Sequence, residues 1–206
     1  MKKLLVILLA VLILCSLAGC GQKKTEQTMT GSWELTDSAE LTSEARESFD
    51  KAMEGFVGVN YEPIAFLGSQ IVSGTNRSFL CEATVVYPNV KPYYAVVTVY
   101  TDLQGKSSIL NIVALNLGEI LESGEIVNGD TADTQMLGSW KIDRESSVNA
   151  ENAVMHLASQ VVSGKNHCVL CKGWVLTFIY ENTEGKTEVL KSVPLDIAAL
   201  SQPKEA

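Results

Sequence analysis

The chain carries the same pattern of residues twice, and this internal repeat limits the folds open to it. The tripeptide Gly-Ser-Trp at 31–33 returns at 138–140, and the hexapeptide SQIVSG at 69–74 returns as SQVVSG at 159–164. The copies lie about 107 residues apart at the tryptophan but about 90 apart at the glutamine, so the second copy is shorter. We therefore predict two diverged copies of one structural unit.

The repeat also predicts how the chain is divided. Unit 1 spans 31–117 and a reduced unit 2 spans 136–197. A linker at 118–135 joins them, and a tail follows at 198–206.

Unit 1 is predicted to be one helix followed by four antiparallel strands. Thr42 or Ser43 can cap a helix over 43–56, which has Glu44 in its first turn. Apolar side chains recur along it at helical spacing, at Ala45, Phe49, Ala52, Met53 and Phe56. Runs rich in Val, Thr and aromatic residues predict strands at 61–72, 79–87, 93–101 and 108–117. This order of elements is typical of an α+β fold.

Unit 2 is predicted to keep the strands and to lose most of the helix. Its strands are expected at 153–162, 166–172, 174–181 and 187–197, whereas 146–152 has room for a turn or two at most. Because an apolar sheet face cannot stay in contact with water, we expect unit 1 or the linker to cover it. A short helix over 149–157 is the alternative.

The N-terminus has the pattern of a secretory signal. Lys2 and Lys3 precede eleven apolar residues, which are too few to span a bilayer core of about 30 Å as a helix. The following Leu-Ala-Gly-Cys at 17–20 resembles the bacterial lipobox. That resemblance implies a signal peptide at 1–19, diacylglycerol on the thiol of Cys20, and a polar tether at 20–30. It places the protein in the bacterial cell envelope, lipid-anchored on the outer side of the membrane.

Composition and motifs argue against several classes of function. A net charge of −8 is wrong for a protein that must neutralise phosphates, so we expect no nucleic-acid partner. The chain has no Walker loop, dinucleotide-binding glycine pattern, nucleophile elbow or HExxH motif, and no carboxylate pair stands out. We expect no enzymatic activity, no cofactor and no small-molecule substrate.

Three cysteines remain once the signal peptide and the lipidated Cys20 are set aside. Cys168 and Cys171 have CxxC spacing, but on a strand their side chains point to opposite faces, so a mutual disulfide is disfavoured. Cys81 could pair with Cys171, or all three could be buried thiols. A zinc site from His156, His167 and the CxxC pair lacks the usual second half-site, so we expect no metal.

The helix, the long strand ending in Gln-x-Val-x-Gly and the later strands resemble the cystatin fold. The pentapeptide occurs at 70–74 and again at 160–164, each time at an expected hairpin tip. Gly31 matches the glycine that cystatins carry on the segment before the helix, whereas the Pro-Trp of their second hairpin tip is missing in both copies. The resemblance covers nearly all of unit 1 and a trimmed form of unit 2.

Cystatins inhibit papain-like cysteine proteases by inserting a wedge made of this N-terminal segment and two hairpin tips. The resemblance implies a similar protein-binding edge, whose residues are Gly31, Gln70, Val72, Gly74, Leu103 and Gln104, with Gln160, Val162 and Gly164 as counterparts in unit 2. An extracellular cysteine protease is the first expected partner. The alternative is a binding module or envelope scaffold that inhibits nothing, because one fold hosts many functions.

Overall fold

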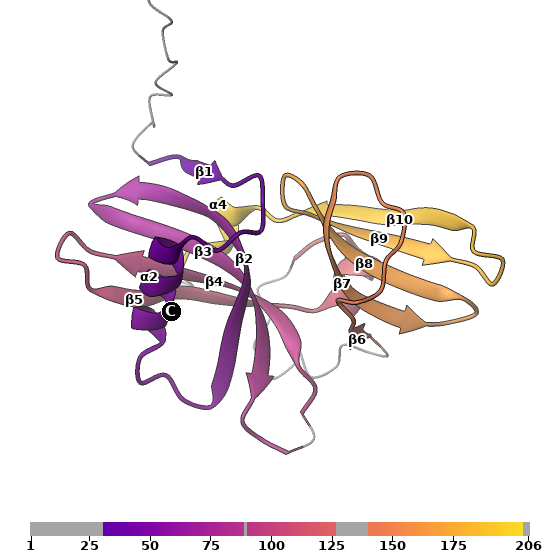
Figure 1. The fold of residues 1–206 in the computed structure, drawn as a ribbon, viewed down its shortest axis with the longest axis horizontal. Coiled ribbons are helices and arrows are strands. Elements are labelled where there is room, and N and C mark those ends of the chain that lie inside the picture. Colours follow the sequence, from indigo (N-terminus) through magenta and orange to yellow (C-terminus); the bar gives the residue numbers. More distant parts are fainter. Residues whose placement is uncertain (1–30, 89, 127–139, 204–206) are drawn as a thin grey trace, which may run out of the picture.

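The computed structural model describes residues 31–88, 90–126 and 140–203, and it consists of two antiparallel sheets with few helices (Figure 1). Each sheet has five strands that pair in the order of the sequence. The α+β prediction is therefore confirmed. The count of four strands is wrong, because a short strand precedes the long hairpin in each sheet. The predicted signal, anchor and tether lie outside the described residues, as do half of the linker and the end of the tail.

The first sheet belongs to unit 1 and the second to unit 2. The strands of the first are β1 (Trp33–Leu35), β2 (Val59–Val72), β3 (Gly74–Val85), β4 (Tyr93–Thr101) and β5 (Ser107–Leu115). Those of the second are β6 (Lys141–Ile142), β7 (Ala153–Val161), β8 (Lys165–Cys171), β9 (Val175–Glu181) and β10 (Thr187–Pro194). Helix α2 (Ser43–Met53) precedes β2, while α3 (Leu117–Ser123) and α4 (Ile197–Leu200) follow the last strand of each sheet.

Helix α2 covers one face of the first sheet. The hydroxyl of Thr42 caps it by accepting from the backbone N–H of Ala45 at 3.2 Å. Phe49 is buried and its ring meets that of Phe79 edge to face, with centroids 5.0 Å apart. The helix ends at Met53 rather than at the expected residue 56, because Gly55 has a positive φ and turns the chain. Phe56 therefore lies outside it and packs against Tyr61.

The second sheet has no helix on the corresponding face among residues 140–203. An extended segment, the strap (residues 143–152), lies there instead. Val148 and Ala150 of the strap pack against a small buried cluster of Val169, Cys171 and Ile179. Among the described residues the strap, and not unit 1 or the linker, packs on this face, which corrects that expectation. The alternative helix over 149–157 is wrong, since β7 begins at Ala153.

The opposite faces of the two sheets share one hydrophobic core. Two buried hydrogen bonds cross it in matched positions. Tyr94 donates to the carbonyl of Leu157 at 2.8 Å, and the indole N–H of Trp174 donates to the carbonyl of Leu67 at 2.6 Å. Leu67 aligns with Leu157 in the sequence repeat, and Tyr94 aligns with Trp174. The two units therefore form one body, in which equivalent residues of the two units make reciprocal contacts across the shared core.

Helices α3 and α4, which follow the last strand of each sheet, also make reciprocal contacts. Asn116 caps α3 and Asp196 caps α4, each by accepting from a backbone N–H three residues later. Lys191 of the second sheet donates to the carbonyl of Glu122 after the first, and Asn111 of the first donates to the carbonyl of Gln202 after the second. Part of the predicted linker and part of the predicted tail are thus structural, and the strands expected to reach 117 and 197 end earlier.

The crossed hydrogen bonds predict how the chain unfolds. Burial raises the pKa of the Tyr94 hydroxyl, which keeps it a protonated donor. Tyr94→Phe should lower the free energy of unfolding by about 1 kcal/mol, because the carbonyl of Leu157 keeps a second donor, the backbone N–H of Asp143. Urea denaturation of residues 31–206 should show a single transition for the wild type and the variant. The control is Tyr87→Phe, at an exposed tyrosine, which should change little. Separate transitions for the two sheets would contradict the shared core.

Candidate functional site

Three segments that are distant in the sequence meet at one end of the first sheet (Figure 1, left). The pairing of Thr75 with Thr101 sets the β2–β3 tip beside the β4–β5 tip. Gly31 joins them, since its N–H donates to the carbonyl of Ile71 at 2.9 Å. We call Gly31, residues 70–74 and residues 102–105 the unit 1 edge. The structure thus brings together the residues that the cystatin resemblance selected in unit 1.

Both polar groups of the Gln70 side chain are hydrogen-bonded to neighbouring residues. Its amide N–H₂ donates to the carbonyl of Gly31 at 2.8 Å, and its oxygen accepts from Asn76 at 2.8 Å. The second sheet repeats the latter bond, as Asn166 donates to Gln160 at 2.9 Å. The glutamine of the pentapeptide therefore ties strands together, and it is not a free contact residue.

The glycine of the pentapeptide is required by a neighbouring ring. A Cβ on Gly74 would lie 2.4 Å from the carbonyl oxygen of Thr101 and 2.7 Å from the ring of Tyr100, whose hydroxyl donates to the carbonyl of Ser73. Gly164 is enclosed in the same way by Glu181 and Tyr180. Sequence reasoning missed the role of these tyrosines, although their recurrence in the repeat was the available signal.

Two large apolar side chains are exposed on the unit 1 edge. Ile71 is 45% exposed and Leu103 is 77% exposed. The second tip is held in shape by Asp102, whose carboxylate accepts from the backbone N–H groups of Gln104 and Lys106, each at 2.9 Å. Two apolar side chains are thus presented on preorganised backbone.

A groove of about 460 Å³ runs between the two tips and the start of helix α2. Ile71, Val72 and Leu103 line it on the tip side. Arg77, nearly buried, also lines the groove, where it is paired with Glu44 of the helix and donates to Thr101 at 3.4 Å. The groove is open and shallow enough for a side chain of a protein partner.

The corresponding edge of the second sheet lies at the opposite end of the molecule (Figure 1, right). Val161 and Val162 are exposed at its first tip, and Gly164 is partly buried. Asn182 shapes the second tip by accepting from the N–H groups of Glu184 and Lys186 at 2.9 Å. Two tips are therefore built alike in both units, but the helix that completes the groove is present only in unit 1.

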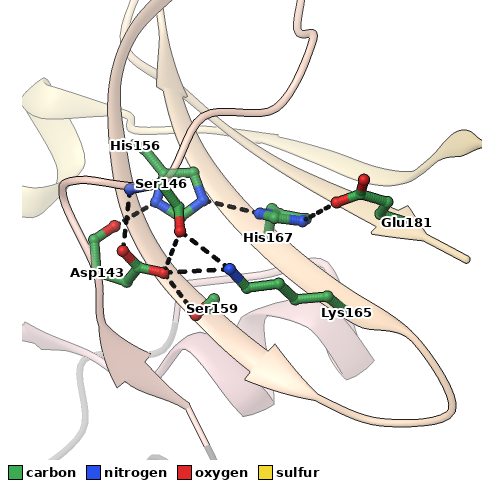
Figure 2. Close-up of polar contacts among 7 residues, drawn as sticks. All are labelled: Asp143, Ser146, His156, Ser159, Lys165, His167 and Glu181. Carbon is green, nitrogen blue, oxygen red and sulfur yellow. Dashed lines mark hydrogen bonds and ion pairs between the residues drawn. The ribbon is translucent and has the colours of Figure 1, made fainter. Parts of the chain in front are cut away.

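A cluster of polar side chains lies behind this second edge, at the start of the strap (Figure 2). Asp143 accepts from Ser146 at 2.6 Å and Ser159 at 2.9 Å, and pairs with Lys165 at 3.4 Å. These bonds, that of Ser146 above all, hold the pKa of Asp143 below its usual range despite burial. Beside it His156 contacts His167, which contacts Glu181. Sequence reasoning considered His156 and His167 as candidate zinc ligands and missed this cluster.

The three cysteines in the described part of the chain form no disulfide. Cys81, Cys168 and Cys171 are free and buried, and burial raises the pKa of the Cys81 and Cys168 thiols, which disfavours the reactive thiolate. Cys168 packs in the shared core and Cys171 on the other face, as the strand geometry predicted. The two histidines contact each other and do not converge with the thiols. Residues 31–88, 90–126 and 140–203 contain no group of metal-binding side chains. No helix within these ranges is long and apolar enough to cross a bilayer.

The packing around Gly74 predicts the effect of an added methyl group. Gly74→Ala should lower the free energy of unfolding by about 2 kcal/mol, because Tyr100 and the backbone of Thr101 must move. Gly118→Ala is the matched control, since its Cβ would meet only an ordinary contact at 3.5 Å within helix α3. Urea denaturation measures both variants. Equal free energies of unfolding for the two variants would show that the close packing around Gly74 does not affect stability.

Comparison with protein-family models, with curated proteins and with solved structures found no match for this chain.

Proposed function

We propose that this chain is a non-catalytic surface lipoprotein of two cystatin-like units, which binds an extracellular protein through the unit 1 edge. The observation that carries the proposal is the meeting of Gly31 and the two hairpin tips at one end of the sheet, with Ile71 and Leu103 exposed on them. Ile71 and Leu103 line one groove, and apolar side chains gathered in one place on a surface mark interaction sites. The matched strand orders and tip contacts of the two sheets support duplication of one unit.

The proposed partner has a cleft, as a papain-like cysteine protease does. A wedge of two tips suits a cleft because both loops are held by internal hydrogen bonds, those of Gln70 and Asp102, and lose little conformational entropy on docking. Ile71 and Leu103 supply apolar contact on either side of the groove. Unit 2 lacks the helix beside its tips, so Gln160, Val162 and Gly164 form a secondary edge in this proposal.

A second candidate function is a binding module or envelope scaffold that inhibits no protease. The composition of the second tip favours it, since Asp102-Leu103-Gln104-Gly105 replaces the Pro-Trp of cystatins. The last strand of the second sheet also has a free edge with Val189 and Leu190 exposed, to which an extended partner segment could add as a strand.

Titration of papain with residues 31–206 separates the two candidates. We expect reversible inhibition, weakened about tenfold by Ile71→Asp or Leu103→Asp, because each places a charge at the centre of an apolar contact. Val189→Asp, at an exposed apolar residue far from the unit 1 edge, is the control and should inhibit like the wild type. Absence of inhibition by the wild type at high micromolar concentration would exclude papain-like proteases and leave the scaffold.

The membrane anchor has a test of its own. Cys20→Ser should abolish incorporation of labelled palmitate and release the protein from the membrane fraction, because two or three acyl chains are needed for stable anchoring. Cys15→Ser is the matched control, since Cys15 lies within the predicted signal peptide and should leave lipidation unchanged. Membrane retention of the Cys20→Ser protein would contradict the lipobox.

A further inference from the structure

Three consecutive contacts link the strap to strand β9 of the second sheet, through β7 and β8 (Figure 2). Nδ1 of His156 contacts the backbone carbonyl of Asp143. Nε2 of His156 lies 2.9 Å from Nδ1 of His167, and Nε2 of His167 lies 3.0 Å from the Glu181 carboxylate. We call these two rings and Glu181 the histidine chain. The outer partners of the two rings are both oxygen acceptors, the carbonyl of Asp143 at one end and the carboxylate of Glu181 at the other.

The three contacts of the histidine chain need more protons than two neutral rings carry. Each of its three contacts needs one proton between its two atoms, and all three protons must come from the two rings when Glu181 is ionised. Two neutral imidazoles carry only two N–H groups. Whichever tautomers are chosen, one contact of the uncharged chain then sets two acceptors against each other. One added proton satisfies all three contacts.

The charges around the chain agree with a single added proton. Asp143 of the strap, Lys165 of β8 and Glu181 of β9 are the charged groups that face the two histidines. With one imidazolium shared between the rings, the positive and negative charges of the cluster balance. Without it, the cluster has one net negative charge beside His167, which is only 1% exposed.

Burial of His167 opposes the uptake of this proton and lowers the pH at which uptake takes place. Desolvation lowers the pKa of His167, and the hydrogen bond to Glu181 acts in the opposite direction. A lowered pKa means that the folded chain takes up its proton at a lower pH than the unfolded chain does. The site therefore fills in mildly acidic solution, and this step costs stability as the pH falls below the ordinary histidine pKa of about 6.5.

We propose that His156, His167 and Glu181 form a binding site for one proton, whose uptake closes the contact between Glu181 and His167. Glu181 is the acceptor that can turn to water when the proton is absent, because its carboxylate is partly exposed, whereas the Asp143 acceptor is a backbone carbonyl. Lys165 directly follows the first hairpin tip of unit 2 and Glu181 directly precedes the second. The proton therefore ties the second tip, through Glu181, to the buried His167 of the second sheet.

Unit 1 has no such site. Phe66 and Arg77 stand at the positions of His156 and His167 in the repeat, and Thr101 stands at that of Glu181. Arg77 keeps its charge at all physiological pH values and pairs with Glu44 of the helix. Within the described residues, a histidine contact beside a hairpin tip is therefore confined to the second tip of unit 2.

NMR titration of the full chain, labelled at histidine and solubilised in mild detergent, tests the site. The chain has only two histidines, so both rings can be followed. We expect both to titrate with one common midpoint and to take up one proton in total. Glu181→Gln should lower that midpoint by about one pH unit, because a glutamine N–H₂ can donate to His167 and satisfies the uncharged chain.

Two further variants keep the outcome decisive. Glu184→Gln removes an equal charge from the same hairpin tip, but Glu184 is exposed and pairs with Lys186, so the midpoint should not move. Lys165→Gln removes a cation that faces His167 and should raise the midpoint. Independent midpoints for the two rings, or equal shifts for Glu181→Gln and Glu184→Gln, would overturn the proposal.

Discussion

The apolar core shared by the two sheets is the contact on which the rest of the molecule depends. A five-stranded meander with one short helix can cover only one of its faces, so each sheet closes its second face against the other. The hydrogen bonds from Tyr94 to Leu157 and from Trp174 to Leu67 cross this core in matched positions. Because the sheets meet in this way, their hairpin tips point outward at opposite ends of the molecule, and two separate edges are available (Figure 1).

The outer faces are closed by different means, and this difference decides the chemistry behind each edge. In unit 1 the rings of Phe49 and Phe79 pack helix α2 onto the sheet, and Arg77 reaches the helix. In unit 2 the strap takes the place of the helix, and beside the tips it borders a polar position. His156 and His167 occupy it, and with Glu181 they make a titratable chain where unit 1 has an aromatic ring and a permanent charge. Similar backbones thus carry different electrostatic properties.

The residues that recur in both hairpins are those that build the tips. Gln70 with Asn76, and Gly74 with Tyr100, hold the first tip in shape, and the same pairs recur in unit 2. In the proposed function, partner contact falls to Ile71 within the pentapeptide and to Leu103 on the second tip, which has no apolar counterpart in unit 2. The glutamine and the glycine of the pentapeptide are structural residues that hold these side chains in place.

The α+β class, the helix start at Ser43 and eight of the ten strands could be predicted from the amino-acid sequence, because periodicity and turn residues are local properties. Their ends fall within three residues of the prediction except at β3, which begins five residues earlier than predicted. The repeat also located the hairpin tips. The remaining features depend on tertiary contacts. β1 and β6 are too short for any period and exist because an edge of β2 or β7 supplies their hydrogen bonds. His156 and His167 come together through strand register, which a bulge between His156 and Ala158 shifts. Register is fixed by pairing and packing over the whole sheet, and no short stretch of sequence contains that information.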